Sequence, residues 1–156
     1  MNLPFPADAK IAFVNMQLIV NDSKLGKSGQ DKLKALTDKR TTDVTAKNGA
    51  IQAKQLEVQN GQNVLTPTVL AQKTSELEAL QRELQFMQQQ AQTELQNLNE
   101  QLLGEFSDRV LPIIEQIRSE KSLLVVFTSG DGSNVAAINP AIDLSAEVVK
   151  RLDAAQ

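Results

Sequence analysis

The sequence of 156 residues predicts an α+β fold, in which a small β body carries a long, projecting, antiparallel α-helical hairpin. Two observations support this prediction. Apolar residues recur every three or four positions through the middle of the chain, which is the period of a helix, and strand-forming runs lie toward its two ends. A turn near residues 61–67 divides the helical region. We therefore expect the body to comprise residues 10–22 and 120–156, and the hairpin residues 23–119.

The first expected element is a strand from Lys10 to about Val20. It contains the apolar run Ile11–Val14, which is rich in strand formers and suits a strand buried on both faces. Asn21-Asp22-Ser23 follows as a break or a helix N-cap, because such side chains accept hydrogen bonds from the free N–H groups that begin a helix. The hairpin should therefore begin near residue 23.

A first long helix is expected from about Lys24 to Asn60. Its composition is polar, and its apolar residues form a single sparse stripe with helical spacing. Basic residues occupy positions on the same stripe, so the stripe cannot form a dry seam throughout. The apolar members are Leu36, Val44, Ile51 and Val58, and the basic members are Arg40, Lys47 and Lys54.

A second long helix is expected from Thr68 to Ser119, with Thr66 as its cap and Pro67 at its first position. Eleven steps of three or four residues cover 40 positions, close to the 3.6-residue period. Such a helix is about 78 Å long and must project from a compact body. Pro112 should kink it or mark where it meets the body. The stripe comprises Leu77, Leu80, Leu84, Met87, Ala91, Leu95, Leu98, Leu102, Phe106, Val110, Ile113 and Ile117.

The charges of the two helices differ in sign. Residues 23–61 carry eight basic and four acidic side chains, a net charge of +4, and residues 62–120 carry four and nine, a net charge of −5. Antiparallel helices of opposite charge attract along their flanks, although each exposed pair contributes only about 0.2–1 kcal/mol. The carboxylates of the second helix are otherwise expected to form a solvated face. They are Glu76, Glu78, Glu83, Glu94, Glu100 and Glu105.

Strand-forming residues return after Lys121. We expect one strand at Leu123–Phe127, a hairpin turn at Ser129–Ser133, a second strand at Val135–Ile138, and a short helix at Ala146–Leu152 capped by Asp143-Leu144-Ser145. Three short strands cannot bury two apolar faces alone, so another copy of the chain should cover them. The expected body and interface residues are Ile11, Phe13, Val14, Leu124, Val126, Phe127, Val135 and Ile138.

The composition excludes several classes of function. Without His or Cys, the chain has no Ser-His or Cys-His nucleophile pair and no imidazole or thiolate metal site, so we expect no enzyme, metal or cofactor. Without Trp or Tyr, and with a net charge of −3, it offers no nucleic-acid platform. Gly26-Lys27-Ser28 resembles the end of a phosphate-binding loop, but Asn21 stands where the first glycine should be.

Three apolar residues fit the helical stripes poorly and are candidates for contact with client chains: Leu56, Leu70 and Phe86. No segment approaches the ~20 apolar residues that span a bilayer. The start of the chain, Met1 to Pro6, lacks the pattern of a signal peptide. The residues alone therefore leave open a cytoplasmic protein or a mature form with an added Met.

Four segments resemble the Skp (OmpH-like) family of periplasmic chaperones, in the family's order and spacing across residues 10–152. Lys10–Gln17 is similar to the opening strand K-I-A-x-V-[DN]-x-Q, and Ser23-x-x-Gly26 to the S-x-x-G that begins the first long helix. Leu123–Phe127 is similar to the late apolar strand, and Ile142–Leu152 to the ending D-[IL]-[ST]-x-[ED]-V-[IVL]-K-x-[LI].

The resemblance implies a periplasmic homotrimer whose leader has been removed. Three helical tentacles would enclose unfolded outer-membrane proteins without ATP and prevent their aggregation. The alternative is a structural coiled-coil or adaptor protein that binds a folded partner. Well-known relatives are strongly basic, whereas this chain has a net charge of −3, which does not favour direct binding of lipid or lipopolysaccharide.

Overall fold

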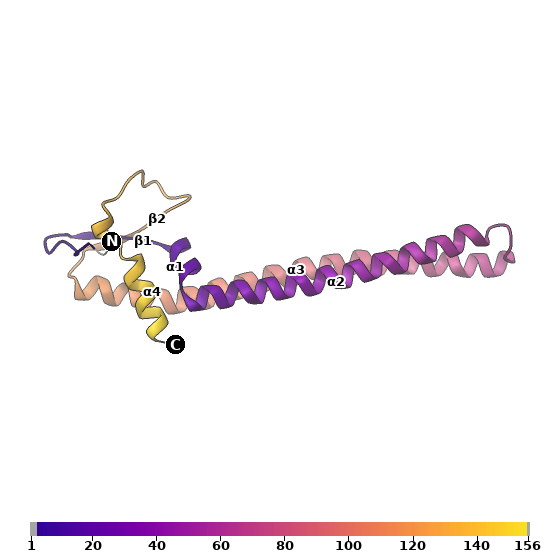
Figure 1. Cartoon of the computed structure of the whole chain (residues 1–156), viewed down its shortest axis with the longest axis horizontal. Helices are drawn as coiled ribbons and strands as arrows, with labels where there is room; N and C mark the ends of the chain where they lie inside the picture. The colour runs from indigo at the N-terminus through magenta and orange to yellow at the C-terminus, as the bar shows by residue number, and fades with distance from the viewer. Residues whose placement is uncertain (1–2, 156) are drawn as a thin grey trace. The chain divides into compact units, whose positions relative to one another are not determined.

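The computed structural model describes residues 3–155, so Met1, Asn2 and Gln156 lie outside the described range. The fold class is α+β, as predicted (Figure 1). The chain divides into two compact units: a body unit, residues 1–31 and 100–156, and a hairpin unit, residues 32–99. The elements are β1 (Ile11–Asn15), α1 (Met16–Asp22), α2 (Lys24–Gly61), α3 (Pro67–Glu120), β2 (Val125–Ser129), the short 3-10 helix η1 (Pro140–Ile142) and α4 (Ser145–Ala154).

The first strand is shorter than predicted, because β1 ends at Asn15 and a helix, α1, replaces its expected second half. The Asn15 side chain accepts a hydrogen bond from the Leu18 N–H at 3.1 Å and so caps α1. Ile19 is fully buried, and Met16 and Val20 pack against the same core. The apolar residues after Asn15 therefore follow a helical spacing, which the run of strand formers concealed.

Ser23 separates α1 from α2 and confirms the predicted helix cap. Its N–H donates to the Ile19 carbonyl at 3.0 Å, and its Oγ accepts from the Gly26 N–H at 3.1 Å. Gly26 is buried, and a Cβ atom placed on it would lie 1.8 Å from the Val20 carbonyl oxygen. The end of α1 thus approaches the first turn of α2 at a distance that only glycine permits.

The sheet of the body unit is two-stranded and parallel. Its register pairs Ile11 with Val125 and Asn15 with Ser129. On its other edge, β1 contacts the segment around Asp143: Phe13 and Asp143 form an isolated parallel bridge, and the Leu144 N–H donates to the Phe13 carbonyl at 2.8 Å. β1 therefore lies between β2 and the segment that leads into α4.

The predicted strand at Val135–Ile138 is wrong for the single chain, in which residues 134–139 form neither strand nor helix. The turn before it does form: the Ser133 N–H donates to the Gly130 carbonyl at 3.0 Å, and Gly130 and Gly132 have positive φ angles of 108° and 82°. Ala136 and Ala137 are exposed. Pairing this segment with β2 would thus bury too little apolar surface to offset the entropy of ordering it.

The core of the body unit joins β1, α1, the C-terminal part of α3, Leu123 in the segment between α3 and β2, and α4. The last helix, α4, begins at Ser145, one residue before the predicted Ala146, and its N-cap residue Leu144 makes no side-chain capping bond. Of the predicted capping residues, Asp143 accepts hydrogen bonds from the Ser145 N–H at 2.8 Å and from the Ser145 hydroxyl at 2.6 Å. The Ser145 Oγ in turn accepts from the Asn15 N–H at 2.7 Å and ties α4 to β1. The buried apolar residues are Ala12, Val14, Ile19, Phe106, Val110, Ile117, Leu123, Leu144, Val148 and Leu152.

The two long helices occur as predicted. Within the hairpin unit α2 and α3 run side by side and are joined by a turn (Figure 1). Thr66 begins α3, with its Oγ accepting from the Val69 N–H at 3.4 Å. α3 continues through Pro112 without interruption. No described helix combines the length and apolar character needed to cross a membrane.

Candidate binding surfaces

The seam between α2 and α3 in the hairpin unit is only partly dry. Of the apolar side chains in residues 32–99, Ile51 alone is buried, and it is 7% exposed. The predicted apolar stripes of both helices do face this seam, but their other members in the unit are half-buried. They are Leu36, Val44, Val58, Leu77, Leu80, Leu84, Met87, Ala91, Leu95 and Leu98.

The basic residues of the α2 stripe each form an ion pair with a glutamate of α3. Arg40 contacts Glu94 at 2.6 Å and Lys47 contacts Glu83 at 2.8 Å. These pairs confirm the predicted attraction between the two helices. They also correct one expectation: Glu76, Glu83 and Glu94 are partners of seam cations rather than members of a plain solvated face.

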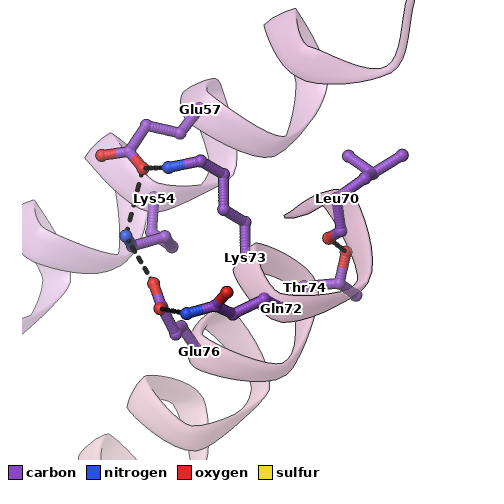
Figure 2. Close-up of polar contacts among 7 residues, drawn as sticks. All are labelled: Lys54, Glu57, Leu70, Gln72, Lys73, Thr74 and Glu76. Atoms are coloured by element: carbon purple, nitrogen blue, oxygen red, sulfur yellow. Dashed lines mark hydrogen bonds and ion pairs between the residues drawn. The ribbon is translucent and has the colours of Figure 1, made fainter. Parts of the chain in front are cut away.

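The pairs nearest the turn form a small network (Figure 2). Lys54 lies between Glu57 and Glu76, at 3.1 Å and 2.9 Å, and Lys73 of α3 reaches Glu57 at 2.8 Å. Gln72 also donates to Glu76, at 3.4 Å. Each cation therefore sits near an acidic group of the opposite helix, and the network ties the end of α2 to the start of α3.

The network shifts the protonation equilibria of its members. Hydrogen bonds from Lys73 and then Lys54 lower the pKa of Glu57, and the hydrogen bond from Lys54 lowers the pKa of Glu76. The pKa of Lys54 is raised, first by its hydrogen bond to Glu76 and then by that to Glu57. These shifts favour the charged forms of Glu57, Glu76 and Lys54.

Two of the three predicted client-contact residues are exposed. Leu56 on α2 is 57% exposed and Phe86 on α3 is 60% exposed, whereas Leu70 is half-buried near the turn and less available than predicted. The structure adds Val64, which is 83% exposed in the turn and was missed because it belongs to neither helical stripe. Side chains in a surface turn are usually exposed, so the position of Val64 in the predicted turn could have identified it as an exposed apolar residue.

The eight predicted body and interface residues fall into three groups. Val14 is buried in the core of its own chain, so it is not available to a second copy. Phe13, Val126, Val135 and Ile138 are half-buried. Three side chains are exposed, with Leu124 the most so: they are Ile11, Leu124 and Phe127.

Sequence reasoning missed two exposed residues of α3 in the body unit, Leu103 and Leu111. They are eight positions apart and so lie on one face of the helix. Their neighbours Leu102 and Val110 belong to the buried stripe. The sequence did contain a signal for both residues, because each is a leucine next to a stripe residue and outside the spacing of three or four positions.

The described residues hold no group of side chains arranged to bind a metal ion. A depression of about 660 Å³ beside α4 has three cations in its lining: Lys121, Lys150 and Arg151. Lys121 and Arg151 are both paired with Glu147, and Arg151 also contacts Glu120. Two of the three positive charges are therefore compensated. The segment Gly26-Lys27-Ser28 is helical, so it cannot cradle a phosphate as a loop does.

Comparison with curated proteins gave no match. Among solved structures, the chain is similar to a Caulobacter crescentus protein described as an OmpH-like outer membrane chaperone, with a TM-score of 0.86. The sequences are 20% identical, and the match covers 100% of this chain and 90% of the other, so the likeness establishes the fold. The family model for OmpH-like outer membrane proteins matches residues 10–152. The chain therefore belongs to the OmpH-like family.

Proposed function

We propose that the protein is an ATP-independent periplasmic holdase that keeps unfolded outer-membrane β-barrel proteins from aggregating. The OmpH-like family is a family of chaperones rather than enzymes. One observation in this chain carries the proposal: the hairpin unit turns Leu56 and Phe86 to solvent while its own seam is partly polar. Scattered apolar contacts on a partly hydrated scaffold suit weak, multivalent binding of an unfolded chain.

The body unit supports a homotrimer as the working form. β2 is one strand of a two-stranded sheet, and such a sheet rarely buries its faces without a partner. Ile11, Leu124 and Phe127 on this sheet or beside it are exposed. We propose that copies of the body cover these side chains.

Light scattering after size exclusion tests both statements. Three chains of 17.1 kDa should elute as a species of about 51 kDa. When a urea-unfolded outer-membrane barrel protein is diluted into it without nucleotide, this species should gain the mass of one client. A monomer or dimer that leaves the client to aggregate would refute the proposal, and tight binding to one folded partner alone would favour the adaptor alternative.

Variants test the contact residues. Leu56→Ser with Phe86→Ser should reduce client retention without changing the oligomeric mass, because these side chains are exposed and belong to the hairpin unit rather than to the body unit. The matched control is Gln52→Ser with Gln85→Ser, two exposed polar positions on the same helices. Equal retention by both double variants would remove the assignment of Leu56 and Phe86.

A further inference from the structure

The hairpin unit and the body unit are stabilised by different forces. The body unit buries ten apolar side chains in one cluster, whereas the hairpin unit buries only Ile51 among its apolar residues. Apolar burial is the dominant favourable term in most folded structures, at about 25 cal/mol per Å². The two helices of the hairpin unit therefore rely more heavily on their polar contacts.

Those contacts are placed where a coiled coil would place apolar side chains. Arg40, Lys47 and Lys54 follow one another at intervals of seven residues, about 10.5 Å along α2. Their side chains are 31%, 24% and 20% exposed, and Lys73 from α3 is 29% exposed. The cations are thus drawn into the seam, with their stems covering its apolar residues and their charged ends on glutamates.

We propose that the four inter-helix ion pairs act as an electrostatic clasp, and that ionic strength controls how often α2 and α3 separate in the hairpin unit. The clasp comprises Arg40–Glu94, Lys47–Glu83, Lys54–Glu76 and Lys73–Glu57. Asp43 also faces Arg40, at 3.0 Å, and Glu57 also faces Lys54.

The two units should differ in their response to salt. The Debye length falls from about 10 Å at 0.1 M to about 3 Å at 1 M, so attraction between partly exposed charges weakens. Apolar burial is not weakened by most salts and is strengthened by sulfate. NaCl should therefore loosen the hairpin unit while the body unit stays protected. For a chaperone, a looser hairpin exposes more of the seam to a client. This consequence rests on the proposed function, whereas the existence of the clasp does not rest on it.

Charge reversal in the full-length protein tests the clasp by hydrogen exchange of peptides within residues 44–58 and 77–91. Lys47→Glu should speed exchange by about fivefold, because an attraction becomes a repulsion. Adding Glu83→Lys should return the rate toward that of the natural protein. Lys39→Glu is the matched control, since Lys39 is an exposed residue of α2 that forms no ion pair with a described residue.

When NaCl is raised from 0.05 M to 1 M, hydrogen exchange in the hairpin of the natural protein should also speed up by about fivefold. In Lys47→Met, which lacks one ion pair, the same rise in NaCl should speed exchange by less. If Lys39→Glu speeds exchange as much as Lys47→Glu, or if Glu83→Lys does not restore the rate, the clasp is refuted. Client retention is measured separately by light scattering. A client that is not retained would refute the proposed function and leave the exchange result standing.

Discussion

Two glycines of α2 should respond oppositely to the same substitution. A Cβ atom on Gly26 would lie 1.8 Å from the Val20 carbonyl oxygen and 2.6 Å from the carbonyl carbon, whereas a Cβ atom on Gly49 would have no atom within 4 Å. Both positions are helical. Alanine should therefore be favoured over glycine by its helix propensity at both positions. The positions differ only in the room available for a Cβ atom.

The magnitudes follow from that difference. Gly49→Ala should stabilise α2 by about 0.5–1 kcal/mol, because alanine loses less conformational freedom in a helix. At Gly26 the backbone of α1 must move by more than 1 Å to restore an ordinary contact, and overpacking of this kind costs about 1–3 kcal/mol or more. Because this cost exceeds the gain from helix propensity, Gly26→Ala should destabilise the body unit.

Urea unfolding followed by circular dichroism measures the sign of each change, at one protein concentration because association shifts apparent stability. Hydrogen exchange then locates the effect: Gly26→Ala should speed exchange in α1 and the first turns of α2, and Gly49→Ala should slow it around residue 49. A Gly26→Ala variant as stable as the natural protein would refute the close approach of α1 to α2.

Three further outcomes are expected. Ile117→Ala should cost about 2–5 kcal/mol in urea unfolding, because it empties a fully buried core position. Ser145→Ala should cost about 1–3 kcal/mol, since it leaves the Asn15 N–H without its 2.7 Å acceptor; an unchanged midpoint would contradict that role. Because the pKa values of Glu57 and Glu76 are lowered, their pairing should stabilise the hairpin fully above about pH 4.3 and be lost as the pH falls further, which protection factors across the hairpin unit would show.

The hairpin could be predicted well because its signals are local. The 3–4 spacing of apolar residues fixed the long second helix, and Thr66-Pro67 fixed its start to within one residue. The opposite charges of the helices predicted that they attract each other, but not which residues form the ion pairs. Arg40 and Glu94 are 54 positions apart, so their pairing depends on how the turn aligns the two helices.

The candidate binding residues were predicted less completely. Leu56 and Phe86 were found because they fall outside an otherwise regular stripe, and the structure leaves both exposed. Leu103 and Leu111 also fall outside it, but neighbouring stripe residues concealed them. Exposure is a property of the whole fold, and a sequence pattern indicates it only where one face is clearly apolar.

The sequence by itself determined the α+β class, the two long helices, the helix cap at Ser23 and the charge of each helix, because these follow from residues within a few positions of one another. The tertiary structure supplied a contact at the end of β1 that no local pattern indicates, since the Asn15 N–H donates to the hydroxyl of Ser145, 130 positions away. It also decided that Val135–Ile138 stays unpaired in one chain. A strand requires a distant partner and a covered face, and neither is encoded by local periodicity.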